Sequence, residues 1–308
     1  MPHTLLRLAM PLAAALVALL TAGGALAAPR CMLAPPGQTQ RIAVSGTGRP
    51  MLLHLPRGFD ARSPAPIVFL LHGSGGTGAG ILAESRLAAA ADRHGFIVAA
   101  PDAGIPAGKG FVWNIPGVPT TRGTVPGPHA ANDTAYIETA IDRLVAAGCV
   151  DPARIYVTGL SGGGRMASWL GCVAADRIAA IAPVVGLRAG NPSHEDERRP
   201  DPATCRPSRP MPILAFAGDH DTTNPIDGGG ASYWRYSMHA AERRWAALDH
   251  CTAAPTTHWV KPGIYEESYT GCAEGSTVIG RITVGETHHW IADDDVMWAF
   301  FARYSRQP

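Results

Sequence analysis

The sequence predicts an α/β fold in a single domain, with a mostly parallel central sheet flanked by helices. Continuous apolar runs, such as residues 66–71, suit strands buried on both faces of a parallel sheet. These runs alternate with helical segments through most of the 308 residues, without internal repeats or a low-complexity linker. A chain that is 46% hydrophobic at this length can bury one large core.

The first 27 residues are expected to be a secretory signal peptide, outside the fold. His3 and Arg7 give a weakly basic start, and an apolar run follows at residues 8–20. Ala25-Leu26-Ala27 is a small-x-small cleavage site, and the apolar run is short for a membrane span. We therefore expect residues 28–308 to form one secreted or periplasmic domain, with no membrane contact after cleavage.

The expected elements follow from hydrophobic spacing and from Gly and Pro punctuation. Strands are expected at residues 40–44, 51–55, 66–71, 96–100, 155–157, 178–185, 211–217, 256–260, 264–269 and 277–284. Helices are expected at residues 81–94, 132–147, 163–174, 232–248 and 293–304. The Gly- and Pro-rich segment 103–131 predicts a long loop near the functional face, and the polar segment 187–210 predicts a solvated loop.

A serine lies at the tip of a predicted strand-to-helix turn. Residues 159–163 read GLSGG and fit the pattern G-x-S-x-G, with a strand before and a helix after. Only small side chains fit two places before and after the serine, and Gly159 and Gly163 supply them. Such a turn raises the Ser161 hydroxyl above the sheet and points the Gly162 N–H toward a developing oxyanion. The pattern predicts that Ser161 is a nucleophile.

A serine nucleophile needs a base, and the base needs an acid that orients it. In chains with this turn the order is serine, acid, histidine. The loop after the strand at 211–217 carries Asp219 and Asp221. We favour Asp221, because it lies further into the loop, whereas Asp219 is expected to bond its own turn. A metal site on this loop, with His220 between the two aspartates, is not expected, because adjacent ligands rarely converge.

The base and the second oxyanion donor come from opposite ends of the chain. His288 and His289 follow the strand at 277–284, and we favour His288 as the base. The Gly-rich loop after the strand at 66–71 should supply the second donor. We favour the Ser74 N–H, with Gly75 as the alternative, and expect the neighbouring His72 to be a hydrogen-bonded structural histidine.

Together these stretches resemble the esterases of the polyhydroxybutyrate depolymerase family, which are close to feruloyl and acetylxylan esterases. The resemblance rests on Leu71-His72-Gly73, Trp113-Asn114, residues 151–161, the run from Gly218 to Asp221 with Pro225, Asp227-Gly228-Gly229 and His288-x-Trp290. It implies the α/β-hydrolase fold, with the acid at Asp221 and the base at His288. We expect no cofactor and no metal.

Six cysteines follow the expected cleavage site, and no C-x-x-C pair suggests zinc or redox chemistry. An even count in an exported chain predicts disulfides, and six cysteines allow fifteen pairings that spacing alone cannot distinguish. A bridge that pins the 187–210 loop to the helix after the serine is also suggested by the resemblance. We expect the pairs Cys172–Cys205, Cys251–Cys272 and Cys31–Cys149.

The sequence therefore predicts a secreted serine esterase that works through an acyl-enzyme. The expected substrates are hydroxyalkanoate oligomers or related esters, and the alternative is a feruloyl or acetylxylan esterase of plant cell walls. Trp113 and Trp290, and also Trp234, could stack on aromatic acids or sugar rings. Less favoured alternatives are a secreted acyltransferase and an inactive binding protein. A net charge of +1 indicates no nucleic-acid partner, and we expect a monomer.

Overall fold

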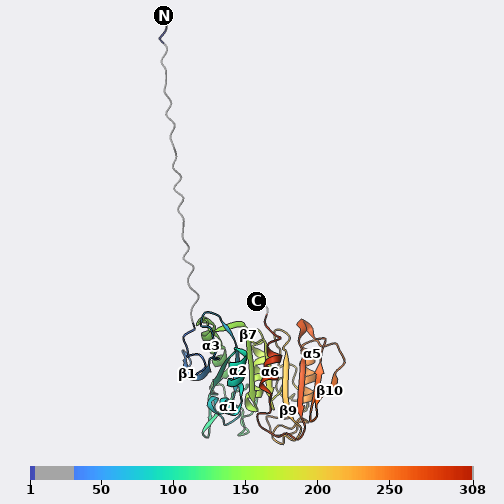
Figure 1. Cartoon of the computed structure of the whole chain (residues 1–308). Coiled ribbons are helices and arrows are strands. Elements are labelled where there is room, and N and C mark those ends of the chain that lie inside the picture. The colour runs from blue at the N-terminus through green and yellow to red at the C-terminus, as the bar shows by residue number, and fades with distance from the viewer. Residues whose placement is uncertain (4–30, 307–308) are drawn as a thin grey trace.

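The computed structural model describes residues 1–3 and 31–306. Apart from its first three residues, the expected signal peptide lies outside the described residues. A ten-stranded sheet runs through the molecule in the order β1-β2-β4-β3-β7-β8-β9-β12-β11-β10, with helices on both faces (Figure 1). Its six central strands, from β4 to β12, are parallel, while both ends of the sheet are antiparallel. This is the expected fold class.

The central strands of the sheet follow the apolar runs of the sequence. Its strands are β1 Thr39–Val44, β2 Arg49–His54, β3 Ala65–Leu71, β4 Ile97–Pro101, β7 Val150–Leu160, β8 Ala180–Val184, β9 Ile213–Gly218, β10 Thr256–Lys261, β11 Ile264–Tyr269 and β12 Val278–Thr283. In β3, Ile67 and Phe69 face one hydrophobic cluster while Val68 and Leu70 face another. Both faces of this strand are therefore buried, which explains its unbroken apolar sequence.

Two layers of helices cover the two faces of the sheet. The helices are α1 Gly78–Glu84, α2 Leu87–His94, α3 Asp133–Ala146, α4 Gly162–Val173, α5 Met238–Leu248 and α6 Asp294–Phe301. Buried side chains of α3, α4 and α5 belong to one cluster, and those of α1, α2 and α6 belong to the other. The central strands therefore lie inside a three-layer arrangement with a core on each side.

Several expected elements differ from the structure, and the strand expected at 155–157 extends from Val150 to Leu160. The helix expected at 81–94 is divided, because Ser85 is extended, with φ −78° and ψ 158°, and ends α1. The helix expected from residue 232 begins at Met238, where the Ser237 side chain caps it by accepting from the Ala240 N–H. The expected loop at 103–131 contains a small hairpin of β5 Ile105–Ala107 and β6 Gly110–Val112.

Three disulfides close separate segments of the chain, and they are the expected pairs. Cys31–Cys149 joins the start of the described domain to the end of the α3–β7 connection. Cys172–Cys205 joins α4 to the loop before β9, and Cys251–Cys272 closes the β10–β11 hairpin. Among the described residues, no helix has the length and apolar character needed to cross a membrane.

Candidate active site

Ser161 lies in a strained turn between β7 and α4. Its backbone has φ 53° and ψ −108°, which is unfavourable for a residue with a side chain. The Ser161 N–H donates to Val184 O at 2.9 Å, so the neighbouring strand β8 holds the turn in place. A Cβ at Gly159 would lie 2.6 Å from Leu71 O, and one at Gly163 would overlap the same oxygen. Glycine is therefore required at both places.

The Gly-rich loop after β3 lies against the start of α4. A Cβ at Gly162 would lie 3.0 Å from Ser74 N, so the backbones of these two residues are adjacent. The Gly75 N–H donates to Phe111 O at 2.8 Å, which leaves it unavailable to a substrate. Within residues 31–306, the Ser74 N–H has no hydrogen-bond partner. The Gly162 N–H is free of intrahelical bonds, because it is in the first turn of α4.

Two buried rings support this loop. His72 Nε2 accepts from the Ala103 N–H at 2.9 Å, while its Nδ1–H donates to Gly73 O at 2.7 Å. Burial lowers the pKa of His72, so the imidazole stays neutral. The Trp113 indole donates to His72 O at 2.8 Å, and the two ring centroids are 4.9 Å apart. His72 is thus the structural histidine that we expected, and Trp113 stabilises the same loop.

Asp221 and His288 are joined by a hydrogen bond. The His288 Nδ1–H donates to Asp221 Oδ2 at 2.7 Å. Asp221 is buried, and its Oδ1 accepts from the Thr223 and Asn224 N–H groups at 2.8 Å each. Burial alone would raise the pKa of Asp221, but the bonds from His288 and from these amides hold it below its usual value. The carboxylate therefore stays ionised and orients the imidazole.

The competing aspartate and histidine have other partners. The Gly285 N–H donates to Asp219 Oδ1 at 2.6 Å, so Asp219 anchors the loop that carries His288. We expected Asp219 to bond its own turn; it instead bonds the loop after β12, because β9 and β12 are neighbours. His289 is exposed, and its Nε2 lies 3.2 Å from Glu286 Oε2. The structure brings Asp221 and His288 together, and neither Asp219 nor His289 shares that contact.

Sheet order places the three loops at one edge. Strands β7, β8, β9 and β12 are consecutive and parallel, so their carboxyl ends lie side by side. Ser161, Asp221 and His288 follow β7, β9 and β12, respectively. The Asn224 side chain donates to Val185 O at 2.6 Å and ties the acid loop to the end of β8. In the described structure the Ser161 hydroxyl makes no hydrogen bond, and such contacts often tighten only with substrate.

The two expected substrate-binding tryptophans lie in different places. Trp113 lines a pocket together with Ser74, Gly162 and Arg165. Trp290 lines a separate depression near α2 and β12, and its indole donates to Asp294 Oδ1 at 3.2 Å. The structure therefore places Trp113 beside the candidate oxyanion donors and Trp290 in a different depression.

Sequence reasoning missed Arg165 and Arg188, which line a second pocket next to the one with Ser74. Arg165 was visible in the sequence, since it comes four residues after Ser161 on α4. Arg188 lies in the segment that we expected to be a solvated loop, yet it is buried. No local signal indicates burial there, because it depends on contacts with α5 and its preceding loop.

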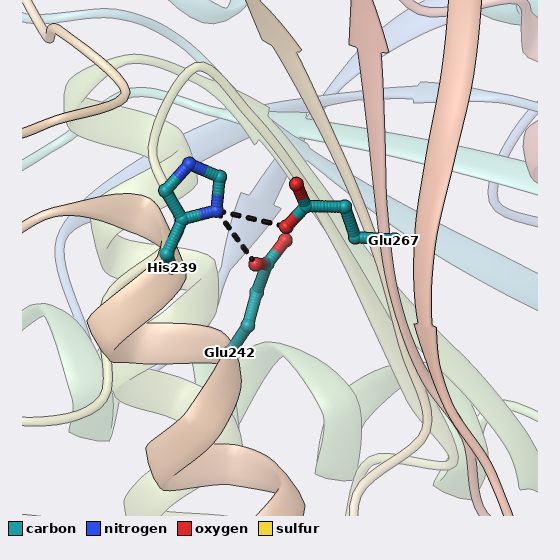
Figure 2. A group of neighbouring side chains, drawn as sticks. All are labelled: His239, Glu242 and Glu267. Atoms are coloured by element: carbon teal, nitrogen blue, oxygen red, sulfur yellow. Dashed lines mark hydrogen bonds and ion pairs between the residues drawn. The ribbon is translucent and has the colours of Figure 1, made fainter. Parts of the chain in front are cut away.

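A separate ionic cluster joins α5 to β11. His239 Nδ1 lies 2.8 Å from Glu267 Oε2 and 3.3 Å from Glu242 Oε2 (Figure 2). Their ligand atoms lie within 4.8 Å of one another, so this group could hold a metal ion. The two carboxylates raise the pKa of His239 to about 10, so a protonated imidazole also satisfies the cluster without a metal.

Known proteins resemble this chain over most of its length. No protein-family model matches it. It is 30% identical over 265 residues to Feruloyl esterase B of Piromyces equi, covering 83% of this chain and 45% of that protein. It is 35% identical over 138 residues to Poly(3-hydroxyalkanoate) depolymerase C of Paucimonas lemoignei, covering 44% of this chain and 31% of that protein. The chain thus spans less than half the length of either relative.

One solved structure has a similar fold. The acetyl xylan esterase from Aspergillus awamori matches with a TM-score of 0.61 at 17% identity, over 86% of this chain and 99% of that one. The protein has the α/β-hydrolase fold. The chain is also a homologue of proteins named feruloyl esterase and poly(3-hydroxyalkanoate) depolymerase. Its three disulfides suit an oxidising compartment.

Proposed function

We propose that this α/β hydrolase is a serine carboxylic-ester hydrolase that works through an acyl-enzyme. The observation that carries the proposal is the Asp221–His288 hydrogen bond, on loops beside the strained turn of Ser161. The esterase homologues support the same chemistry. In this assignment Ser161 is the nucleophile, His288 is the base and Asp221 orients the base.

In the first half-reaction, Ser161 Oγ attacks the ester carbonyl carbon while His288 Nε2 takes the hydroxyl proton. Asp221 stabilises the imidazolium, since its carboxylate accepts the Nδ1–H bond. The Ser74 and Gly162 N–H groups donate to the oxyanion of the tetrahedral intermediate. The C–O bond to the alcohol then breaks, and His288 passes the proton to the leaving oxygen. The product is a Ser161 ester of the acid.

In the second half-reaction, water replaces the alcohol. His288 Nε2 takes a proton from the water, whose oxygen attacks the acyl carbon. The same two N–H groups donate to the second oxyanion, and the bond from Ser161 Oγ to the acyl carbon breaks. The proton returns to Ser161, and the free acid departs. The residues named suffice for both steps, and no cofactor enters the scheme.

The proposed substrates are hydroxyalkanoate oligomers or related small esters. A second candidate is a feruloyl or acetylxylan ester, because the match to Feruloyl esterase B covers 83% of the chain. We further propose that residues 28–308 are a secreted or periplasmic monomer, after removal of a signal peptide at 1–27. The cysteine pairing supports export.

Labelling with a fluorophosphonate tests the nucleophile. The native protein should be labelled, whereas Ser161→Ala should not be. Replacement of His288 by Ala should lower kcat on 4-nitrophenyl acetate about as severely as Ser161→Ala, because nucleophile and base act as a unit. His289→Ala is the matched control and should keep most activity. An active His288→Ala variant together with an inactive His289→Ala variant would show that the base is assigned wrongly.

Values of kcat/KM on hydroxybutyrate dimers, feruloyl esters and acetylated xylan oligomers would rank the substrates. Hydroxybutyrate dimers are expected to rank first, and a ranking led by feruloyl esters would favour the second candidate. Assays with added acceptor alcohols test for acyl transfer, since an acyltransferase would form new esters in place of free acid. A native protein that fails to label and hydrolyses none of these esters would refute the proposed function.

A further inference from the structure

Two arginines near the candidate oxyanion donors are buried without an acidic partner. The exposed fractions of Arg165 and Arg188 are 5% and 7%. In the described part of the chain, no Asp or Glu carboxylate contributes to the pKa of either guanidinium. Most buried arginines are paired with a carboxylate, because an uncompensated buried charge is strongly unfavourable.

Each guanidinium is held but not satisfied. Arg165 Nη2 donates to Ser74 Oγ at 3.2 Å, and its Cζ lies 4.1 Å from the ring centroid of Tyr233. Arg188 Nη1 donates to Tyr236 O at 2.8 Å, and its Cζ lies 3.2 Å from the Tyr236 ring centroid. Among the described atoms, Arg165 Nε and Arg188 Nη2 have no hydrogen-bond partner. Each arginine therefore has a nitrogen whose N–H has no acceptor.

The two charges also repel each other. The pKa of each arginine is lowered to about 10, mainly by burial, and for Arg165 the charge of Arg188 contributes to the lowering. Both remain protonated at neutral pH, so two like charges lie together in a buried site. Aromatic faces offset part of this cost, but only an anion would neutralise it.

The arginines share a pocket next to the one that the candidate oxyanion donors Ser74 and Gly162 line. A small cavity of about 20 Å³ is lined by both arginines and by apolar side chains, including Ile115, Val118 and Trp169. A neighbouring cavity is also lined by Arg165 and Ile115, and it reaches Ser74 and Gly162. An anion in the first cavity could therefore belong to the same molecule as an ester carbonyl held by the oxyanion donors.

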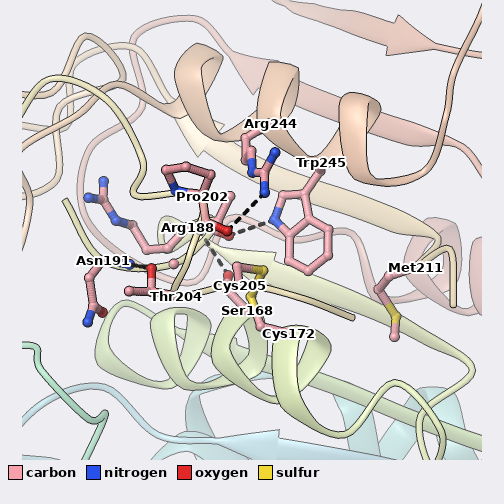
Figure 3. The surroundings of a disulfide bond; sticks show 12 residues. Ser168, Cys172, Arg188, Asn191, Pro202, Thr204, Cys205, Met211, Arg244 and Trp245 are labelled. Carbon is pink, nitrogen blue, oxygen red and sulfur yellow. Dashed lines mark hydrogen bonds between the residues drawn. A yellow bond between two sulfur atoms is a disulfide. The ribbon is translucent and has the colours of Figure 1, made fainter. Parts of the chain in front are cut away.

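The pocket is rigid where it carries Arg188. The Arg188 N–H donates to Ser168 Oγ at 3.0 Å, and the Trp245 indole donates to Arg188 O at 2.6 Å. Figure 3 shows these contacts beside the Cys172–Cys205 bridge, which joins α4 to the loop that follows Arg188. Because the guanidinium is positioned before any ligand arrives, binding would cost little conformational entropy.

We propose that Arg165 and Arg188 bind a carboxylate of the substrate, so that the preferred esters are those that carry a free acid group. The guanidinium fork matches a carboxylate in shape and charge, and the apolar walls suit a short hydrocarbon chain between acid and ester. This inference rests on the proposed ester hydrolase and narrows its substrates. The acid end of a hydroxyacid oligomer has the required chemistry, whereas a neutral feruloyl or acetyl ester does not.

Matched pairs of esters test the inference. One pair is mono-4-nitrophenyl succinate and its carboxamide analogue, with the acid on the acyl side. The other is 3-acetoxybutanoate and 3-acetoxybutanamide, with the acid on the alcohol side. In the native protein, kcat/KM for the acid should exceed that for the amide by about 10- to 100-fold in at least one pair, since bonds to charged groups have that effect.

Variants show whether the arginines cause the preference. In Arg188→Met and in Arg165→Met, the ratio of acid to amide should fall toward one. Because the ratio is internal to each preparation, a partly folded variant still reports it. Arg188→Lys should keep an intermediate ratio, since it retains charge but loses the fork. Arg122→Met is the control, because Arg122 is exposed and does not line this cavity, and it should keep the native ratio.

Binding to Ser161→Ala separates this inference from the proposed function. Calorimetry should show that 3-acetoxybutanoate binds this variant more tightly than 3-acetoxybutanamide. If the native protein hydrolyses neutral and acidic esters of both pairs equally well, the carboxylate site is refuted and the esterase stands. If Ser161→Ala binds the acid selectively while the native protein hydrolyses no ester, the anion site stands and the proposed function is refuted.

Discussion

Removal of the disulfides should destabilise the protein in an order set by loop length. The three bridges span 118, 33 and 21 residues, and the loops follow one another without overlap. Each bridge therefore restricts its own part of the unfolded chain. The loop-closure relation gives about 4.9 kcal/mol for Cys31–Cys149, about 3.7 kcal/mol for Cys172–Cys205 and about 3.3 kcal/mol for Cys251–Cys272.

The three contributions should add, because the loops are separate in the sequence. Their sum, about 12 kcal/mol, is comparable to the whole stability of an ordinary domain. We therefore expect the fully reduced protein to be unfolded, and each paired Cys→Ala variant to be folded but weaker. At roughly 2 °C for each kcal/mol in a domain of this size, the midpoint of thermal unfolding should fall by about 10 °C, 7 °C and 7 °C, respectively.

Guanidinium unfolding of the three paired variants measures these losses directly. Four of the six cysteines are buried, so truncation leaves small cavities at Cys31, Cys149, Cys172 and Cys205. A single Cys→Ala variant lacks the same bridge but keeps one thiol, and its difference from the pair isolates the truncation cost. If the Cys251–Cys272 pair proved the most destabilising after this correction, reasoning from loop entropy would be wrong.

Three further perturbations follow from individual contacts. Gly163→Ala should abolish soluble, active protein, because the new Cβ would overlap Leu71 O. Gly80→Ala is the control, because its Cβ would meet only Thr77 Oγ1 at 3.4 Å. Equal yields of the two variants would contradict the packing argument. Asp219→Ala should lower kcat/KM about tenfold by freeing the Gly285 N–H, with KM nearly unchanged, and unaltered kinetics would argue against this anchor. Because the pKa of His239 is raised to about 10 in the folded protein, its protonated imidazole stabilises the fold. This contribution is fully present below pH 6.5 and is lost as the pH rises toward 10. Urea unfolding from pH 6 to pH 10 should show a steeper loss in the native protein than in His239→Gln, and parallel curves would exclude this contribution.

The fold was predictable because its signals are local. The apolar run at β3 is enough to predict a strand buried on both faces. The glycines beside Ser161 are enough to predict a tight turn. The division of α1 from α2 was not predictable in this way. Apolar spacing continues through Ser85, and only the extended conformation of that residue interrupts the helix.

In the candidate site, too, local sequence signals were predictive, whereas contacts between distant segments were not. Loop position was enough to favour Asp221 over Asp219, and the structure shows that the two aspartates have different partners. The choice between Ser74 and Gly75 depends on Phe111 O, which belongs to a hairpin that the sequence did not predict. Arg165 and Arg188 likewise lie in one pocket only because of how distant segments pack. The catalytic roles themselves stay predictions until the variants are measured.

The hydrogen bond from Gly285 to Asp219 has a consequence for how such a site can change over time. A second bond, from the His220 N–H to Glu286 O at 3.0 Å, joins the same two loops. The loops that carry Asp221 and His288 are thus fastened to each other independently of the side chains that they present. Insertions elsewhere on the rim can reshape the substrate pocket while the spacing between acid and base is inherited intact. If the proposed function holds, these two bonds separate substrate recognition from catalysis, so specificity can diverge among relatives while the catalytic loops keep their spacing.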